Sequence, residues 1–213
     1  MIDLTDRRKE YTQTGLDESA LSPTPFGLFD AWLHIALESN LPEPYAMTLA
    51  TATTDGAPSA RIVLLRKVDE RGFVFFTNYL SRKGGEICEN PRCALLFYWP
   101  ELERQVRIEG LIARVSPAES DEYHNHRPTK SRLAAAALVQ SRVISSRAEL
   151  ETSFEALAQQ YPKGDNPRPE HWGGYRLSPD YFEFWQGRTS RLHDRLFYRL
   201  GSGGIWETGR LAP

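Results

Sequence analysis

The chain has 213 residues, of which 40% are hydrophobic and 11% aromatic, and its formal net charge is -2 at pH 7. This composition is that of a folded globular protein, and the near-neutral charge argues against non-specific binding to nucleic acid. No apolar run approaches the roughly 20 residues of a membrane-spanning helix, and the charged first residues lack the apolar core of a secretory signal. We therefore expect a cytoplasmic protein without a membrane partner. The spacing of Cys88 and Cys93 indicates neither a disulfide framework nor a zinc site.

The N-terminal part of the chain is predicted to be an arm followed by a helix. Residues 1–24 are polar and charged, so we expect a mobile arm unless something orders it. Arg8 and Tyr11 lie three residues apart in this arm, and a single helical turn would bring them together. A packing helix is predicted from Pro25 to Asn40. Its apolar residues fall near one helical stripe, which comprises Phe26, Phe29, Trp32, Leu33, Ile35 and Ala36.

The next part of the chain has the composition of strands. Apolar or alternating runs occupy Ala46–Thr54, Ser59–Lys67, Phe73–Thr77, Cys93–Trp99 and Glu103–Ser116. A tight turn at residues 55–56 should join the first two runs, and a turn at 69–72 should form a β-hairpin between 62–65 and 73–77. About five antiparallel strands with short connections and no βαβ pattern predict a closed or nearly closed barrel.

The C-terminal half of the chain should combine helices with further strands. Helices are predicted at 118–127, 130–138 and 146–161, followed by a proline-containing loop at 162–169. Strand-like, aromatic runs at 175–178, 181–187, 192–200 and 205–211 should complete the sheet. We therefore predict an α+β fold dominated by β, with one domain over residues 25–213 and a small peripheral helical cluster at 118–161.

Positively charged residues gather at the predicted hairpin and at the start of the helix that follows it. Arg61 and Arg66 lie near the ends of one strand, and Arg82 and Lys83 follow Ser81, a possible N-cap. Guanidinium groups and unsatisfied N–H groups at a helix start suit a phosphate. Ordinary solvated charges that flank a hairpin are the alternative. Strict alternation places Arg61 and Arg66 on opposite strand faces, so either a bulge intervenes or they serve different groups.

Three residues in the helical segment could form a second anion site. Tyr123, Arg127 and Ser131 follow one another at four-residue steps, which on one continuous helix would give a stripe of hydrogen-bond donors. Pro128 pushes Arg127 away from helical geometry, so the stripe becomes the end of one helix and the start of the next. Such an arrangement can still converge on an anion.

The segment at residues 191–195 has the most suggestive spacing. If it is extended, Arg191, His193 and Arg195 share one strand face. This cationic face would hold an anionic ligand and keep His193 neutral through like-charge repulsion, whereas an exposed edge strand is the alternative. Gln140 and Ser141, on a polar break, could hydrogen-bond a heterocycle or cap helices.

No nucleophile–base pair, carboxylate dyad or metal cluster stands out, which indicates that a bound cofactor carries the chemistry. Several separated motifs together resemble those of the pyridoxamine 5′-phosphate oxidase family. They are RRKEYT, RIVLL, FFTNYLSRK, LERQVRIEG, YHNHRP, QSRVIS, HWGGYR, FEFWQG, RLHDR and RLAP. The resemblance runs from about Arg8 to Pro213. It implies a split β-barrel, a homodimer with FMN at the subunit interface, and oxidation of pyridoxine or pyridoxamine 5′-phosphate to pyridoxal 5′-phosphate by O2, with release of H2O2 and, from the amine, ammonia.

The resemblance also implies a role for each matching residue. The FMN contacts from the hairpin side would be Arg61, Arg66, Phe76, Thr77, Arg82, Lys83 and Gln105. The FMN contacts from the other subunit would be Gln140, Ser141, Trp185 and Arg195. The substrate phosphate would be bound by Arg66, Tyr123, Arg127 and Ser131. Arg191 and His193 would be the catalytic residues over the substrate ring, and Arg8 and Tyr11 would belong to the arm that closes on it.

The chain departs from the family pattern at two of these positions. The family usually has Lys where this chain has Arg66, and often Tyr where it has Phe76. Arg keeps the positive charge but exchanges a compact ammonium for a broad planar fork, so affinity or substrate preference could differ. Phe76 lacks the hydroxyl.

Two other functions are open to a chain with this sequence. One is a split-barrel FMN oxidase for another heterocycle, such as a phenazine precursor, and the other is a non-catalytic module that binds FMN or pyridoxal phosphate. The presence of Tyr123, Arg127 and Ser131 together favours the vitamin B6 substrate over another heterocycle, and a peroxide assay with pyridoxine 5′-phosphate would separate an enzyme from a binding module.

Overall fold

The structure, a computed structural model, describes residues 2–5, 10–13, 15–137 and 140–213. Its strands are β1 Ala46–Ala52, β2 Pro58–Leu64, β3 Lys67–Asp69, β4 Gly72–Asn78, β5 Arg92–Trp99, β6 Arg104–Arg114, β7 Trp172–Gln186, β8 Asp194–Leu200 and β9 Trp206–Leu211. Its helices are α1 Pro25–Glu38, α2 Arg82–Glu89, α3 Pro117–His126, α4 Thr129–Ala137 and α5 Arg147–Gln160, with 3-10 turns at Glu18–Ala20 and Thr189–Arg191. Within these residues, one nine-stranded sheet has hydrogen-bonded neighbours in the order β2, β1, β5, β6, β7, β4, β3, and β8 pairs with both β7 and β9.

The helices and strands divide between two compact units. Unit 1 contains Met1–Leu49, Ala94–Gly110 and Pro179–Pro213, and unit 2 contains Ala50–Cys93 and Leu111–Ser178. Helix α1 and strands β8 and β9 belong to unit 1, whereas β2 to β4 and α2 to α5 belong to unit 2. Strands β1, β5, β6 and β7 contribute residues to both units. In the described part of the chain, no helix is both long and apolar enough to cross a membrane.

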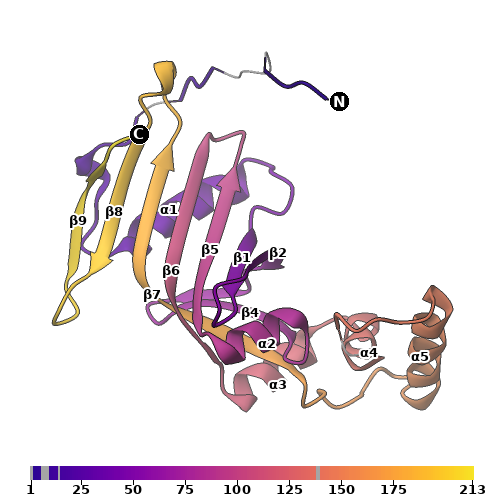
Figure 1. The fold of residues 1–213 in the computed structure, drawn as a ribbon. Helices are drawn as coiled ribbons and strands as arrows, with labels where there is room; N and C mark the ends of the chain where they lie inside the picture. Colours follow the sequence, from indigo (N-terminus) through magenta and orange to yellow (C-terminus); the bar gives the residue numbers. More distant parts are fainter. Residues whose placement is uncertain (1, 6–9, 14, 138–139) are drawn as a thin grey trace. The chain divides into compact units, whose positions relative to one another are not determined.

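The core of unit 1 forms where helix α1 packs against strands β5 and β7 (Figure 1). Phe29 contacts Phe97 edge-on with ring centroids 5.1 Å apart, and Trp32 contacts Phe184 in the same way at 5.4 Å. These four rings are buried, so the aromatic stripe of the sequence becomes the packing face of the helix. The predicted helix is confirmed. Ile35 was wrongly placed on the stripe, because it lies beside the packing face and is 41% exposed.

The described residues between 10 and 24 are attached to unit 1 at several points. The backbone N–H of Leu16 donates to Asp194 Oδ2 at 3.0 Å, and Leu16 itself is buried. The N–H of Ser22 donates to the hydroxyl oxygen of Tyr198 at 3.0 Å. Asp194 and Tyr198 both belong to β8, so this strand anchors the N-terminal segment.

The strands of unit 2 differ from the prediction in one pairing. Strand β2 returns beside β1 through a turn in which the Thr53 N–H donates to the Ala57 carbonyl. Strand β4 pairs instead with the short strand β3, with Lys67 opposite Val74. The predicted turn at 69–72 therefore does form a hairpin, but the pairing of 62–65 with 73–77 is wrong, because the first arm is 67–69. The strand that contains residue 62 ends at Leu64 and pairs with β1.

Strand β7 is the second difference from the prediction. The runs at 175–178 and 181–187 were expected to be separate strands, but they form one strand of 15 residues. Its first part pairs with β4 and its second part pairs with β8, so it has a hydrogen-bonding partner on both sides of Pro179. The other predicted strands and the three helices of the middle segment are confirmed, with ends that differ by a few residues.

Helix α2 begins where the sequence predicts. Ser81 is its N-cap, and the Ser81 Oγ accepts a hydrogen bond from the Gly84 N–H at 3.3 Å. A Cβ on Gly84 would lie 2.1 Å from the carbonyl oxygen of Tyr79, whereas a Cβ on Gly85 would meet nothing within 4 Å. Glycine at position 84 therefore allows the start of this helix to approach the backbone that follows β4.

We expect Gly84→Ala to destabilise the protein by about 1–3 kcal/mol, because relief of the overpacked contact requires a shift of α2. Gly85→Ala is the matched control. It should be neutral or stabilise by about 0.4–1 kcal/mol, because Ala is favoured over Gly in a helix and finds open space here. Urea unfolding measures both free energies. Equal stability of the two variants would contradict the close approach at position 84.

Candidate functional site

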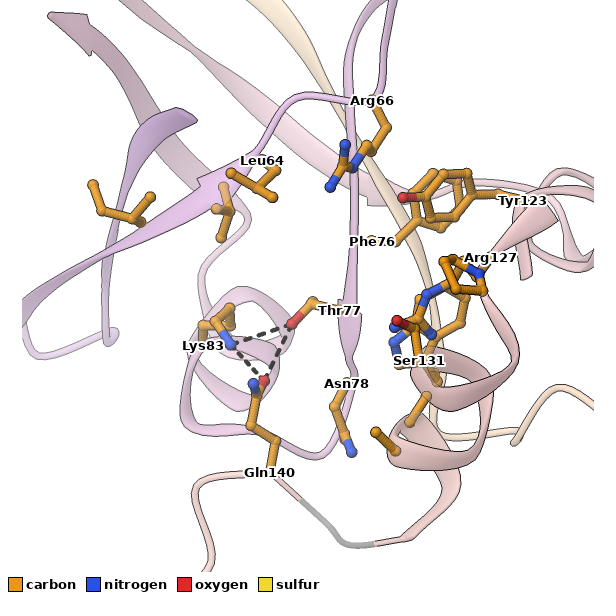
Figure 2. A pocket seen from close by; sticks show the side chains of 16 residues that line it. Leu64, Arg66, Phe76, Thr77, Asn78, Lys83, Tyr123, Arg127, Ser131 and Gln140 are labelled. Atoms are coloured by element: carbon orange, nitrogen blue, oxygen red, sulfur yellow. Dashed lines mark hydrogen bonds between the residues drawn. The ribbon is translucent and has the colours of Figure 1, made fainter. Parts of the chain in front are cut away.

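A pocket of about 610 Å³ lies within unit 2, with walls from β2, β4, α3 and α4. Figure 2 shows two groups of polar side chains on opposite sides of it. One group is Lys83, Thr77 and Gln140, and the other is Arg66, Tyr123, Arg127 and Ser131. A second pocket of about 370 Å³ shares residues with the first and is also lined by Arg61, Arg82 and Ser141. The two pockets together collect the predicted site residues that belong to unit 2.

Lys83 is a buried cation in this pocket, with 8% of its surface exposed. Its ammonium donates to Gln140 Oε1 at 2.7 Å and Thr77 Oγ1 at 3.2 Å (Figure 2). It also donates to Ser81 Oγ at 3.3 Å. All three acceptors are neutral oxygens, so none of these hydrogen bonds cancels the charge. Burial, together with the nearby charge of Arg61, lowers the pKa of Lys83 to about 8. A buried ammonium in this position is stabilised by an anionic ligand.

Arg61 and Arg82 lie beside Lys83 in the second pocket. Arg61 donates from Nη1 to Thr51 Oγ1 at 2.5 Å and from Nη2 to Glu86 Oε2 at 2.9 Å. Arg82 donates from Nε to the other carboxylate oxygen of Glu86 at 2.8 Å. Three positive charges thus face one negative charge, and the excess makes this the first cationic end of the site.

The second cationic end is formed by Arg127 and Arg66. Arg127 follows the last residue of α3 with extended backbone angles, as the proline after it predicts. Its guanidinium lies over the Trp172 ring, 4.4 Å from the centroid, and its Nη1 is buried with no hydrogen-bond partner among the described residues. Burial lowers the pKa of Arg127, and the charge of Arg66 acts in the same direction. Ser131 lies in the first turn of α4 and lines the same pocket, so Tyr123, Arg127 and Ser131 do come together there, whereas their binding of an anion stays a prediction.

Three stacked aromatic rings support the second end. The Phe76 and Tyr123 centroids are 3.9 Å apart with an interplanar angle of 19°, and Tyr123 and Trp172 are 6.2 Å apart at 10°. His124 is fully buried and meets Trp172 edge-on at 5.6 Å. Burial, and then the positive charge of Arg127, lower the pKa of His124, so its ring is neutral near pH 7. The stack is a rigid, apolar platform beneath the guanidinium of Arg127.

Unit 1 contains a separate cluster around His193. The His193 ring lies 4.8 Å from Trp185 and 5.5 Å from Tyr11, measured between centroids. The backbone N–H of Arg188 donates to His193 Nδ1 at 3.1 Å. Because Nδ1 accepts this bond, the neutral ring carries its proton on Nε2. The structure therefore brings three predicted site residues together and fixes the tautomer of the imidazole.

The predicted extended strand over residues 191–195 is wrong. Strand β8 begins at Asp194, and Arg191 lies in a 3-10 turn. Strand alternation therefore does not place Arg191 and His193 on a common face with Arg195. Ser190 and Arg191 have positive φ angles of 54° and 62°, although neither is glycine. Such strained backbone concentrates at functional sites, so this turn is a candidate for one.

The remaining predicted residues are placed as follows. Arg195 donates from Nε to Glu183 Oε1 and from Nη1 to the carbonyl of Ala212, both at 2.8 Å. Gln105 lies on the half-buried face of β6, where the predicted alternation is confirmed. Arg8 lies outside the described residues.

Residues 140–141 reach the pocket of unit 2 within a single chain. Gln140 accepts its hydrogen bond from Lys83, and Ser141 adopts a positive φ of 71°. Contact of these two residues with the FMN of a second subunit stays a prediction.

The residues that hold Arg61 and Arg82 are not among the predicted site residues. Glu86 accepts hydrogen bonds from both arginines. Two local signals pointed to this network, since Glu86 follows Arg82 by four positions on a helix and Ser59 shares a strand face with Arg61. Thr51 comes from the neighbouring strand, and no local pattern indicates it.

The solved structures define the class of fold, a split barrel. PhzG from Burkholderia lata 383, solved in complex with tetrahydrophenazine-1-carboxylic acid, aligns with a TM-score of 0.87 and 34% identity, over 93% of this chain and 98% of that one. A pyridoxamine 5′-phosphate oxidase-related, FMN binding protein from Nostoc punctiforme PCC 73102 aligns with a TM-score of 0.72 and 20% identity, over 91% of this chain and 100% of that one. The predicted α+β split-barrel fold is confirmed.

The chain belongs to the pyridoxamine 5′-phosphate oxidase family and is an oxidoreductase. The pattern of that family matches residues 33–161, and the pattern of the pyridoxine 5′-phosphate oxidase C-terminal dimerisation region matches residues 172–213. The pyridoxine/pyridoxamine 5′-phosphate oxidase of Paraburkholderia phymatum is 58% identical over the whole of both chains. The protein of the same name from Cyanothece sp. is 54% identical over 100% of this chain and 99% of that one. The family expected from the motifs is confirmed.

We expect the amine of Lys83 to titrate with a midpoint of about 8. Below this pH the charged amine attracts an anion, and above it the attraction is lost. The measurement is an NMR titration of the lysine Cε resonances, with Lys83→Met as the variant that assigns the signal. Inorganic phosphate should move the midpoint upward, because a bound anion favours the ammonium form. A Lys83 midpoint in the ordinary lysine range without phosphate would show that the amine is solvated.

Proposed function

We propose that this chain oxidises pyridoxine 5′-phosphate and pyridoxamine 5′-phosphate to pyridoxal 5′-phosphate, with FMN as cofactor and O2 as electron acceptor. The products besides pyridoxal 5′-phosphate are H2O2 and, from the amine, ammonia. The observation that carries this proposal is the pair of cationic ends on connected pockets of unit 2. Two ends suit two phosphates, one on the cofactor and one on the substrate. The names of relatives at 54–58% identity support the same reaction.

The first cationic end fits the phosphate of FMN. A phosphate monoester carries about -1.5 to -2 charges at pH 7. Arg61 and Arg82 offer guanidinium groups to it, and the ammonium of Lys83 has hydrogen bonds to neutral oxygens but, among the described residues, none to a carboxylate. Thr77 and the apolar part of β2 line the adjoining pocket, which suits a flavin ring. When bound, FMN accepts a hydride from the substrate and passes the electrons to O2.

The second cationic end fits the phosphate of the substrate. The buried Nη1 of Arg127 has no hydrogen-bond partner among the described residues, and a phosphate oxygen would accept a hydrogen bond from it. Tyr123, Ser131 and Arg66 line the same pocket and add hydroxyl and guanidinium donors. A ligand bound by its phosphate here is held in one orientation, which lowers the entropic part of the barrier.

The residues that would orient the substrate ring, Arg191 and His193, belong to unit 1. His193 is fixed by Arg188, Tyr11 and Trp185, so its Nε2 proton can be donated in a constant direction. Arg191 adds a positive charge from the strained turn beside it. These two residues are the catalytic residues of the proposal, and they act by position and hydrogen bonding.

A homodimer with FMN at the subunit interface is part of the proposal. The match of residues 172–213 to a C-terminal dimerisation region supports it. In this arrangement Gln140, Ser141, Trp185 and Arg195 contact the FMN of the other subunit. The closing arm would bring Arg8 and Tyr11 to the substrate.

An oxidase for a phenazine precursor is a second candidate, and the likeness to PhzG favours it. The second cationic end favours a phosphorylated substrate instead, because its two guanidinium groups and two hydroxyls offer more charge and more donors than a single ring carboxylate uses.

The FMN-loaded protein should release H2O2 from pyridoxine 5′-phosphate in a peroxidase-coupled assay. Unphosphorylated pyridoxine should be poorer by on the order of 100-fold in kcat/KM, because it lacks two charge-assisted hydrogen bonds. Arg127→Ala should reduce this preference. A flavin-loaded protein that yields no peroxide would be a binding module, and activity confined to an unphosphorylated heterocycle would favour the phenazine-type reaction.

Arg191→Ala should keep its full flavin content but lose about 2–4 kcal/mol of transition-state stabilisation, as expected for a charge-assisted hydrogen bond in a desolvated site. His193→Ala should act in the same direction more mildly, because a neutral imidazole contributes no full charge. Anaerobic stopped-flow reduction of the bound flavin gives the rate and substrate affinity. Wild-type values in flavin-replete Arg191→Ala would show that this turn does not face the substrate.

A further inference from the structure

Glu86 is a buried carboxylate beside the first cationic end, with 5% of its surface exposed. Thr51 Oγ1 donates to its Oε2 at 2.5 Å and Ser59 Oγ at 2.6 Å. Arg61 donates to the same oxygen at 2.9 Å, and Arg82 donates to Oε1 at 2.8 Å. Both oxygens of the carboxylate are therefore used, and the donors come from two strands and a helix.

The carboxylate is fully ionised in this environment. Burial alone would raise its pKa, but the hydrogen bonds from Ser59, Thr51, Arg82 and Arg61 outweigh burial and lower the pKa of Glu86 to about 2. A buried ion pair is a poor source of stability, since well-packed apolar residues often serve as well or better. The network is thus better explained by what it does to the two arginines.

Glu86 restricts both guanidinium groups. Arg61 also donates to Thr51 and Ser59, so the two hydroxyls that bind Glu86 bind Arg61 as well. The side chain of Arg82 is 69% exposed, and its Nε bond to Glu86 fixes a group that would otherwise sample many rotamers. One carboxylate thereby orients two cations of the same end.

Glu86 also sets the charge of that end. Arg61, Arg82 and Lys83 together carry three positive charges, which repel one another at close range. The single negative charge of Glu86 leaves a net charge of two, equal and opposite to that of a phosphate dianion. Without Glu86, the arginines would separate toward solvent to relieve their repulsion.

We propose that Glu86 is a positioning residue for the cofactor phosphate. It holds Arg61 and Arg82 in the orientation that a phosphate monoester requires, and it lowers the net charge of the first cationic end to the value that suits this ligand. This inference rests on the proposed function, because it takes FMN as the ligand of the first end. Glu86 does not touch the flavin ring in this role, so its effect is confined to the phosphate.

The test compares FMN with riboflavin, which has the same ring and no phosphate. Dissociation constants are measured with the apoprotein by quenching of flavin fluorescence, for wild type, Glu86→Gln and a control. Asp69→Asn is the matched control, because Asp69 also accepts from two arginines of unit 2, Arg176 at 2.6 Å and Arg71 at 2.8 Å, but lies outside both pockets.

Glu86→Gln should weaken the affinity for FMN by about tenfold or more, as loss of a residue that supports a ligand does at metal sites. It should leave the affinity for riboflavin nearly unchanged. Asp69→Asn should change neither. Equal losses for FMN and riboflavin, or no loss for FMN, would overturn the positioning role while the proposed function stands. Wild-type protein that does not bind FMN would overturn both.

Ser59→Ala covers the case in which Glu86→Gln does not fold. It removes one hydroxyl that joins Glu86 and Arg61 but changes no charge. The expected result is a smaller loss, again selective for FMN over riboflavin. A stable Ser59→Ala protein with wild-type affinity for FMN would count against the network.

Discussion

The excess of buried positive charge in unit 2 is the constraint on which the site depends. Lys83 is largely removed from water, yet its three hydrogen bonds go to neutral oxygens. An ammonium in this state costs free energy unless a counter-charge is supplied. Glu86 compensates part of the charge of Arg61 and Arg82. The positive charge that is left over favours an anionic ligand in this pocket.

Local backbone structure puts these charges in place. The N-cap at Ser81 starts α2, and Gly84 lets that start approach the backbone after β4. Because of this approach, Lys83 on the helix reaches Thr77 on the strand. Lys83 is therefore positioned by one capped helix and one strand, which are more rigid than a loop would be.

The two units contain different kinds of order. In unit 2, the guanidinium of Arg127 is held over the face of Trp172. In unit 1, His193 is locked by a backbone hydrogen bond and two aromatic neighbours. The strained turn at Arg191 is also fixed in unit 1, since its backbone is held in a conformation that non-glycine residues avoid.

The sequence by itself determined the features that depend on neighbouring residues and on whole motifs. These are helix α1, the cap of α2, the helix break between Tyr123 and Ser131, and membership of the family. Only the tertiary structure decided that β4 pairs with β3, that β7 is continuous, and that Arg61 donates hydrogen bonds to Thr51 and Glu86. The physical reason is that the alternation of side chains along one strand depends on neighbouring residues and assigns each residue to a strand face. The topology of the sheet brings distant strands together, and it therefore determines which distant side chain forms a hydrogen bond with a buried charged group.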